Sequence, residues 1–280
     1  MYEAIVIGGG PAGLQAALTL GRMHRRTLLV DSGEYRNATV ERAHNLLTND
    51  GVAPGELRAR ARAELAAYST VEVRDAGVRS VAVDGDGFSV GFDHGETVRG
   101  RRVVLATGVR DELPPIPGLA AEWGRRVAQC PFCHGHEFAG RPVAVSLAGD
   151  HAEMIRRMLE PVASDVVVIP PDAIARIVAE PDGLRIETVD GGATAVAGLF
   201  VAPKPSQRAP FAEALGCRML PSGAVEVDAV GATSVPGVYA AGDMAHTAMT
   251  PGPMVSLAAA IAAGQIAAAG VVRDLIADRP

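Results

Sequence analysis

The 280-residue chain has few cysteines, few aromatic residues and no block of like charge. The chain has three cysteines, an odd and low number that argues against a secreted domain stabilised by disulfides. The net charge is −6 and neither sign is clustered, which argues against a nucleic-acid-binding surface and a polybasic membrane contact. Aromatic residues make up 4% of the chain but hydrophobic residues 48%, so we expect a sizeable core built mainly from Ala, Val and Leu.

The sequence also shows no leader segment and no long hydrophobic span. After Met1-Tyr2-Glu3 the chain enters an apolar segment directly, without a basic stretch or a small-residue cleavage site. The longest apolar stretch, residues 255–269, is shorter than the ~20 residues that cross a bilayer. We therefore expect a soluble, cytoplasmic protein without a membrane partner.

The first 31 residues predict one βαβ unit with a glycine-rich turn. A strand at 2–7 leads to a helix at 14–22, and a second strand at 27–30 ends at Asp31. Three glycines occupy the GxGxxG positions of a dinucleotide-binding turn, namely Gly8, Gly10 and Gly13. In such a turn the backbone approaches a pyrophosphate at the helix N-terminus, and the acidic residue accepts hydrogen bonds from a ribose. A glycine-rich turn without a ligand is the alternative, and the flanking strand, helix and acid argue against it.

Two proline-rich segments, 113–118 and 203–205, are candidate domain boundaries. Before the first, the pattern predicts a helix and four strands, at 55–68, 71–74, 78–83, 88–92 and 98–105. Between them it predicts a second, smaller βαβ unit followed by short strands, at 142–147, 152–159, 166–169, 174–179, 184–188 and 195–201. After the second boundary, an alanine-rich helix is expected to start near Pro253.

A CxxC pair, Cys130 and Cys133, is followed by His134 and His136. Two thiols one helical turn apart can close a disulfide, and a helix N-terminus favours the thiolate of the first. Structural zinc normally takes two separated ligand pairs, and the sequence offers no second pair, so we predict no metal site. A glutaredoxin-like site would follow a first strand rather than a complete βαβ unit, and a pair of inert core cysteines is the remaining interpretation. Cys217 has no partner in the sequence pattern and is expected to be a buried small hydrophobe.

Together these motifs resemble those of the low-molecular-weight thioredoxin reductases. The resemblance covers nearly the whole chain and includes the glycine turn, Asp31, the CxxC pair and the segments 106–108 and 236–243, in the family's order. It implies an α/β flavoprotein with two dinucleotide-binding domains. Residues 1–114 and 204–280 would form the FAD-binding domain, and residues 115–203 a shortened pyridine-nucleotide-like insert. The resemblance also implies a homodimer formed through the FAD domains.

Carried over residue by residue, the resemblance implies FAD as cofactor and a set of residues that contact it: Gly8, Gly10, Pro11, Ala12, Gly13, Asp31, Asn45, Thr107, Gly108, Gly242, Asp243, Met254 and Val255. Asn45 would approach the flavin, Asp243 the ribityl chain, and the helix start at 253–256 the isoalloxazine ring. Cys130 would be the outer, exchanging thiol and Cys133 the thiol beside the flavin. His134 would shuttle protons, with His136 as a weaker candidate for the same role.

The sequence departs from the reductase pattern in the insert. The second glycine turn, 146–152, keeps only Gly149 and places Asp150 where a pyrophosphate would lie. Ile169 is followed directly by Pro170-Pro171-Asp172, without an arginine. The insert is short and holds one βαβ crossover, whereas a nucleotide-binding half needs two. The motif Cys-Pro-Phe-Cys-His-Gly-His, with His134 where reductases usually have aspartate, is similar to that of the dithiol oxidases of holomycin- and gliotoxin-type natural products.

We therefore predict an FAD-dependent dithiol–disulfide oxidoreductase that acts as a dithiol oxidase. Its partners would be molecular oxygen and a small-molecule or peptide dithiol, with no nucleic acid. A reductase of thioredoxin-like proteins, supplied by NADPH or ferredoxin, is the first alternative. A flavin-binding redox sensor whose CxxC does not turn over is an alternative of another class.

Overall fold

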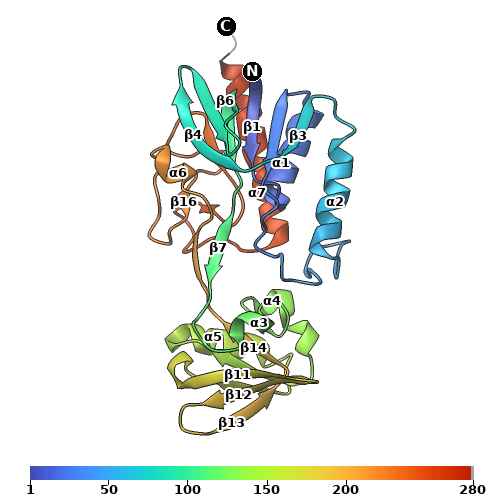
Figure 1. The fold of residues 1–280 in the computed structure, drawn as a ribbon, viewed down its shortest axis with the longest axis vertical. Coiled ribbons are helices and arrows are strands. Elements are labelled where there is room, and N and C mark those ends of the chain that lie inside the picture. The colour runs from blue at the N-terminus through green and yellow to red at the C-terminus, as the bar shows by residue number, and fades with distance from the viewer. Residues whose placement is uncertain (279–280) are drawn as a thin grey trace. The chain divides into compact units, whose positions relative to one another are not determined.

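The computed structural model describes residues 1–278, which form two compact units. Unit 1 comprises residues 1–36, 55–110 and 205 onward, and unit 2 comprises residues 37–54 and 111–204. Both units contain parallel strands with at least one helix packed against them (Figure 1). Residues 37–54 pack with unit 2, although the family resemblance implied that they belong to the FAD-binding domain. The functional assignment of the two units stays a prediction.

Unit 1 contains a seven-stranded sheet in which β6 is shared between two halves (Figure 1). The parallel half has the order β3–β2–β1–β6–β17, with bounds Val71–Asp75, Thr27–Asp31, Tyr2–Ile7, Thr97–Leu105 and Val238–Ala240. The first part of β6 pairs antiparallel with β5 (Gly87–Phe92), which pairs with β4 (Val78–Asp84). The predicted βαβ unit and the predicted meander are therefore parts of one sheet.

Alternate side chains of β1 point to opposite faces of this sheet, as the period of a strand requires. Ala4 and Val6 pack in the cluster that includes α1 (Pro11–Arg22) and α7 (Leu257–Ala277). Ile5 and Ile7 pack in the cluster that includes β5 and the short helix α6 (Phe211–Ala214). Cys217 lies in that second cluster, where burial raises the pKa of its thiol, so it is the buried small residue expected. The remaining elements of unit 1 are α2 (Pro54–Leu65), β16 (Val225–Glu226) and β18 (Ala245–His246).

Helix α7 is long and apolar enough to cross a membrane by length and composition, yet it is a core helix of unit 1. It packs against α1 so closely that a Cβ on Gly264 would lie 2.0 Å from the Ala12 carbonyl oxygen. The helix begins at Leu257, four residues after the predicted start near Pro253. Ser256 is its N-cap, because the Ser256 hydroxyl accepts a hydrogen bond from the Ala259 N–H at 3.1 Å.

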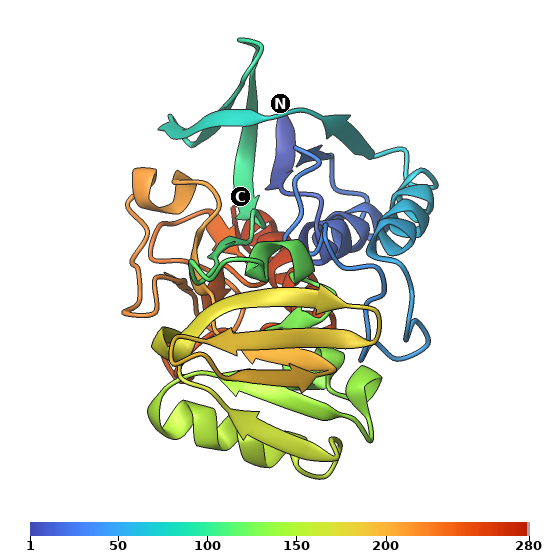
Figure 2. The same ribbon diagram turned by 60° about the horizontal axis from the view of Figure 1, so that its bottom comes forward.

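Unit 2 has three layers, formed by two sheets and a helix. The parallel sheet has the order β10–β9–β14–β8, with bounds Asp165–Val168, Pro142–Ser146, Gly198–Val201 and Val127–Ala128. One apolar cluster joins this sheet to α5 (Gly149–Leu159), and another joins it to the antiparallel sheet β11–β12–β13 (Ile174–Glu180, Gly183–Thr188 and Ala193–Val196), whose strands run side by side in Figure 2. The strand predicted at 195–201 is thus two strands, which are divided at Ala197 and belong to different sheets.

Short elements complete the fold. In unit 2 they are α3, α4, η1 and η2, with bounds Leu119–Glu122, Pro131–His134, His136–Phe138 and Pro171–Ala173. Strands β7 (Val109–Glu112) and β15 (Lys204–Gln207) pair with each other at the two boundaries where the chain passes between the units.

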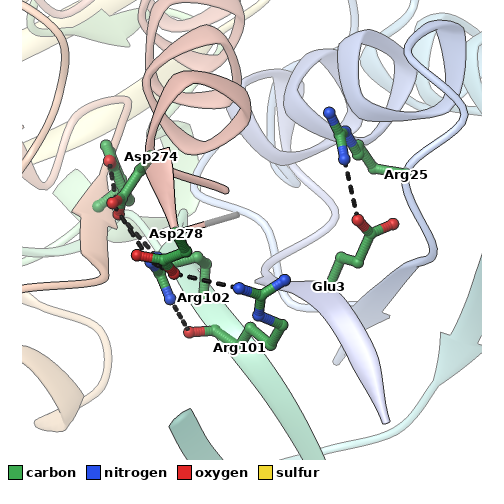
Figure 3. A network of polar contacts seen from close by, with 7 residues as sticks. Glu3, Arg25, Arg101, Arg102, Asp274 and Asp278 are labelled. Atoms are coloured by element: carbon green, nitrogen blue, oxygen red, sulfur yellow. Dashed lines mark hydrogen bonds and ion pairs between the residues drawn. The ribbon is translucent and has the colours of Figure 1, made fainter. Parts of the chain in front are cut away.

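A polar network ties the last turns of α7 to β6 in unit 1 (Figure 3). The Arg102 side chain is only 9% exposed and donates to Asp274 from Nε at 2.7 Å and from Nη2 at 3.2 Å. It also pairs with Asp278, and Tyr239 donates to Asp274 at 3.2 Å. Carboxylates are unfavourable at a helix C-terminus, because the helix dipole is negative there. The Arg102 guanidinium offsets this repulsion for Asp274 and Asp278.

Figure 3 also shows a second ion pair of unit 1, in which Glu3 of β1 accepts from Arg25 at 3.0 Å.

Replacing Arg102 with Met should destabilise the protein by about 1–3 kcal/mol, because Asp274 and Asp278 lose their main cation in a partly buried site. Urea unfolding at neutral pH measures the change. The pKa of Asp274 is lowered, chiefly by the Arg102 hydrogen bonds, so the stabilisation is present above the ordinary carboxyl pKa and is lost as pH falls through the lowered one. Arg60→Met removes an exposed ion pair with Glu56 and should cost less than about 0.5 kcal/mol. Equal effects of the two substitutions would contradict the account.

Candidate functional site

The glycine turn between β1 and α1 has the close backbone packing of a dinucleotide cradle. Gly8 has a φ of +118°, and a Cβ there would lie 2.2 Å from the Ala106 carbonyl oxygen. A Cβ on Gly13 would lie 1.8 Å from the Gly8 carbonyl oxygen. A Cβ on Gly10, in contrast, would meet no described atom within 4 Å, so open space lies over that glycine. Helix α1 starts at Pro11 with no acidic side chain in its first turn, which leaves N–H groups and a positive dipole end suited to a pyrophosphate.

Asp31 lies at the end of β2 beside this turn, but protein donors already occupy its carboxylate. It is 2% exposed, and it accepts hydrogen bonds from the Tyr35 hydroxyl at 2.6 Å, Arg62 at 3.0 Å and the Gly33 N–H at 3.0 Å. Burial and the Asp31 contact raise the pKa of Tyr35 to about 12, so its hydroxyl stays a donor. The Arg58 guanidinium lies 3.7 Å from the centre of the Tyr35 ring. Asp31 therefore ties the segment after β2 to α2, and its hydrogen bond to a ribose stays a proposal.

The other side of the α1 N-terminus is lined by segments distant in sequence. Gly242 has a φ of +83°, and its Cβ would lie 3.1 Å from the Ala12 Cβ. Asp243 accepts from Arg36 at 2.8 Å, and the Thr107 hydroxyl, next to Gly108, donates to the Met244 sulfur at 3.4 Å. Unit 1 thus brings two short segments that contain predicted FAD residues next to the glycine turn. They hold Thr107 and Gly108 in one segment, and Gly242 and Asp243 in the other.

Three predicted FAD residues do not lie in that group. Met254 and Val255 precede α7 rather than starting it, and Met254 is exposed, so the expectation of a helix start aimed at the ring is wrong in its bounds. Asn45 belongs to unit 2, where its N–H donates to Asp50 at 2.7 Å. The roles of all three toward the flavin stay proposals.

The CxxC pair lies on one turn of helix in unit 2. Cys130 is the N-cap of α4, Pro131 is its first residue, and Cys133 is its third. The Cys130 carbonyl accepts from the N–H groups of Cys133 and His134 at 3.1 and 3.2 Å, which fixes the relative position of the two cysteines. Both cysteines are half-buried. The turn packs close to α5, since a Cβ on Gly135 would lie 3.3 Å from the Leu159 side chain.

His134 differs from His136 in its surroundings. The Nδ1 atom of His134 is buried and has no hydrogen-bond partner among residues 1–278, whereas His136 is exposed. Burial lowers the pKa of His134, which favours the neutral ring that can accept a proton at physiological pH. Among the two predicted candidates, the structure therefore favours His134 for proton transfer.

The sequence pattern missed two residues beside this turn. His44 Nε2 lies 3.4 Å from the Glu137 Oε1, and Glu137 is the fourth residue after Cys133. Helical spacing did not indicate Glu137, because α4 ends at His134 and Glu137 lies in the separate 3-10 turn η1. No local pattern indicated His44, which reaches this site only because residues 37–54 fold into unit 2. In the described part of the chain, no three His, Cys, Asp or Glu side chains are grouped as a metal site would need.

The second glycine turn, between β9 and α5, differs from the first in the charge at the start of its helix. Gly149 is the first residue of α5, and Asp150 stands in the first turn, where its negative charge opposes a bound phosphate. Ser146 precedes the turn; it is buried, and its hydroxyl has no hydrogen-bond partner within residues 1–278. The segment after β10 is the 3-10 turn η2, which contains Asp172 and no basic residue. Neither Asp150 nor Asp172 offers a positive charge to a phosphate group.

A dinucleotide cradle in one unit and a CxxC helix turn in the other define a flavin-dependent thiol oxidoreductase. The family profile of the pyridine nucleotide-disulphide oxidoreductases matches residues 2–150 and 146–266, and the chain belongs to this family. Thioredoxin reductase tcpT of Claviceps purpurea is 32% identical over 98% of this chain and 96% of its own length. The crystal structure of an Agrobacterium tumefaciens oxidoreductase has a TM-score of 0.90 at 33% identity and covers 99% of both chains. That of HlmI has a TM-score of 0.90 at 33% identity, over 99% of this chain and 93% of its own.

These comparisons confirm three of the predictions. The protein has the thioredoxin reductase-like two-domain α/β fold. It is an FAD-binding flavoprotein, and the close packing of the glycine turn, with its open face at Gly10, fits that cofactor. It is an enzyme that acts on sulfur groups.

Proposed function

We propose that this protein is an FAD-dependent dithiol oxidase that closes a disulfide in a small-molecule or peptide dithiol and uses molecular oxygen as the final acceptor. The observation that carries the proposal is the second glycine turn, where Asp150 occupies the first turn of α5 and one glycine remains. An enzyme that takes electrons neither from NADPH nor from a protein such as ferredoxin takes them from its thiol substrate. The similarity of the Cys130–His136 motif to dithiol oxidases of the holomycin and gliotoxin type supports the same direction.

In this proposal the glycine turn and the residues around the α1 N-terminus hold the FAD pyrophosphate and ribityl chain. The cradle residues are Gly8, Gly10, Pro11, Ala12 and Gly13, with Asp243 and Thr107 on the opposite side. When bound, FAD supplies the two-electron acceptor that returns the protein dithiol to the disulfide. We further propose a cytoplasmic homodimer, as the family resemblance implies.

The chain's own residues carry the thiol exchange. A substrate thiolate attacks Cys130 in the Cys130–Cys133 disulfide; the S–S bond breaks, and Cys133 leaves as a thiolate. The second substrate thiol loses its proton to the neutral His134 ring and attacks the substrate sulfur bound to Cys130. That attack releases the oxidised substrate and leaves two electrons on the cysteines. Overall, a dithiol and O2 give a disulfide and H2O2.

An anaerobic titration distinguishes the oxidase from a reductase that is supplied by NADPH. We expect dithiothreitol to bleach the flavin absorbance stoichiometrically, and NADPH to bleach it at least about a hundredfold more slowly, since one repulsive contact in a partly desolvated site costs several kcal/mol. Admitting air to the dithiol-reduced sample should produce one peroxide per flavin. Rapid bleaching by NADPH would overturn the proposal in favour of the reductase. A flavin that neither reagent reduces would favour the sensor.

A further inference from the structure

Phe132 is exposed, whereas the other phenylalanines of this chain are buried. Phe132 is 70% exposed, and none of the other five is more than 6% exposed. The five buried residues are Phe88, Phe92, Phe138, Phe200 and Phe211. Phe132 lies between the two cysteines, as the second residue of α4. The exposed phenylalanine of the chain therefore belongs to the redox turn.

Other residues anchor this turn to the rest of unit 2. Gly135 lies against α5, since a Cβ on it would lie 3.3 Å from the Leu159 side chain. Phe138, in η1, is the aromatic residue of this segment that enters the core, where its ring contacts the Phe200 ring edge-on at 6.0 Å between centres. Because most of the Phe132 surface faces solvent, its ring contributes little to this packing. The ring is therefore available to a molecule that comes to the turn.

The position of Phe132 in the turn places it near the Cys130 side chain. Cys130 is the N-cap of α4, and Phe132 follows Pro131 as the second helical residue. The side chain of an N-cap lies beside the second and third residues of its helix, and helical side chains lean toward the N-terminus. The N–H groups of Cys133 and His134 donate to the Cys130 carbonyl and hold the turn in this shape. We therefore expect the Phe132 ring to border the sulfur that exchanges with the substrate.

A substrate that is joined to Cys130 has to come close to this ring. In the mixed disulfide the substrate sulfur is bonded to the Cys130 sulfur at about 2.0 Å, so the first carbon atoms of the substrate lie over the N-terminal end of α4. The ring carries no polar atom, and an apolar group that covers it releases water from both surfaces. An aromatic group gains more, because two rings attract each other in offset or edge-to-face arrangements. A scaffold that bears hydroxyl groups gains neither contact.

We propose that Phe132 is a specificity-determining residue of the dithiol site and selects dithiols that are borne on an apolar, preferentially aromatic, scaffold. The inference rests on the proposed function and names the substrate class within it. The ring forms no bond and moves no proton or electron, because it acts only by packing against the substrate. Such a contact stabilises the bound substrate and the transition state alike, so its loss should raise KM more than it lowers kcat.

Two dithiols of matched chemistry test the proposal. Dithiothreitol and ortho-benzenedimethanethiol both carry their thiols on CH2 groups and both close a six-membered cyclic disulfide, but the first scaffold bears hydroxyl groups and the second is a benzene ring. Phe132→Ala should lower kcat/KM for the aromatic dithiol by about tenfold, mainly through KM, and change that for dithiothreitol by less than about twofold. The ratio of the two values within one variant is the measure, because a change in the reactivity of the protein disulfide affects both substrates.

Two further variants serve as controls. Val189 of unit 2 is also 70% exposed but lies outside the redox turn, so Val189→Ala should leave the ratio unchanged. Phe132→Tyr keeps an aromatic ring and should hold the ratio within about threefold of the wild-type value. FAD content and circular dichroism check that each variant is folded. An unchanged ratio in Phe132→Ala, or equal losses for the two dithiols, would overturn the inference.

A second readout needs neither oxygen nor turnover. The oxidised holoprotein is mixed anaerobically with a low concentration of each dithiol, free thiols are alkylated, and mass spectrometry gives the rate at which the Cys130–Cys133 disulfide opens. The ratio of the two opening rates should also fall by about tenfold in Phe132→Ala. Opening without peroxide after air is admitted would contradict the proposed function, while the ratio would still decide the role of Phe132. Normal peroxide formation with an unchanged ratio would contradict that role alone, and a disulfide that neither dithiol opens would overturn both.

Discussion

Replacing Cys133 with Ser should abolish dithiol oxidation, by about a thousandfold or more, and leave the protein yellow with bound FAD. Serine keeps the size and the place of the side chain in α4, whose N–H groups are bonded to the Cys130 carbonyl. A hydroxyl cannot form or release a disulfide, so no electrons leave the substrate. Stopped-flow reduction by dithiothreitol, with peroxide measured after air is admitted, reports the loss.

The third cysteine provides the matched control for this experiment. Cys217 is buried in the core of unit 1, where its thiol lies 3.5 Å from the Thr233 hydroxyl. Cys217→Ala should keep turnover within about twofold and cost about 1 kcal/mol of stability, as loss of a small buried side chain does. Undiminished turnover in the Cys133 variant, or its loss in the Cys217 variant, would show that the redox centre has been misplaced.

Replacing Gly13 with Ala should lower FAD affinity by about a hundredfold or more. The new methyl group would lie 1.8 Å from the Gly8 carbonyl oxygen, so the turn has to open and the first residues of α1 have to move. A shift of about 3 kcal/mol in the cost of forming the cradle corresponds to the stated loss of affinity. Flavin content after purification and fluorescence titration of the apoprotein measure it.

Gly10→Ala separates the fold of the turn from its contact with the cofactor. A Cβ on Gly10 meets no described atom within 4 Å, and its φ of −75° suits alanine. The thermal stability of the apoprotein should therefore be unchanged in this variant, whereas that of Gly13→Ala should fall. Weaker FAD binding by a normally stable Gly10 variant would locate the pyrophosphate over this residue. Full FAD binding by both variants would contradict the cradle.

The proximity of Cys130 and Cys133 followed from the sequence because it depends on local geometry. Two residues three apart in a helical turn lie close together whatever the rest of the chain does, and Pro131 suits the first helical position. The first βαβ unit was predictable for a similar reason, since Gly13 is required by its contact with the nearby Gly8 carbonyl and the strand, turn and helix follow one another directly. These predictions used hydrophobic periodicity and turn chemistry, both of which span a few residues.

The surroundings of these motifs depended on contacts that no local pattern encodes. Asp31 looked available to a ribose, yet Tyr35 and Arg62 already donate to it, because α2 packs beside the end of β2. A continuous apolar run at 195–201 predicted one strand, yet Ala197 divides it between two sheets. Strand propensity measures how well a side chain fits a pleated surface, so it does not specify which sheet the strand joins.

The sequence by itself determined the family, the glycine turn and the spacing of the two cysteines, because each of these depends on short motifs whose residue types are constrained by backbone geometry. Only the tertiary structure decided what surrounds the dithiol. It brought residues 37–54 into unit 2 and His44 to within 3.4 Å of Glu137. The physical reason is that the charge on a side chain acts through space over several ångströms, and the chain separation between two charges does not fix their distance.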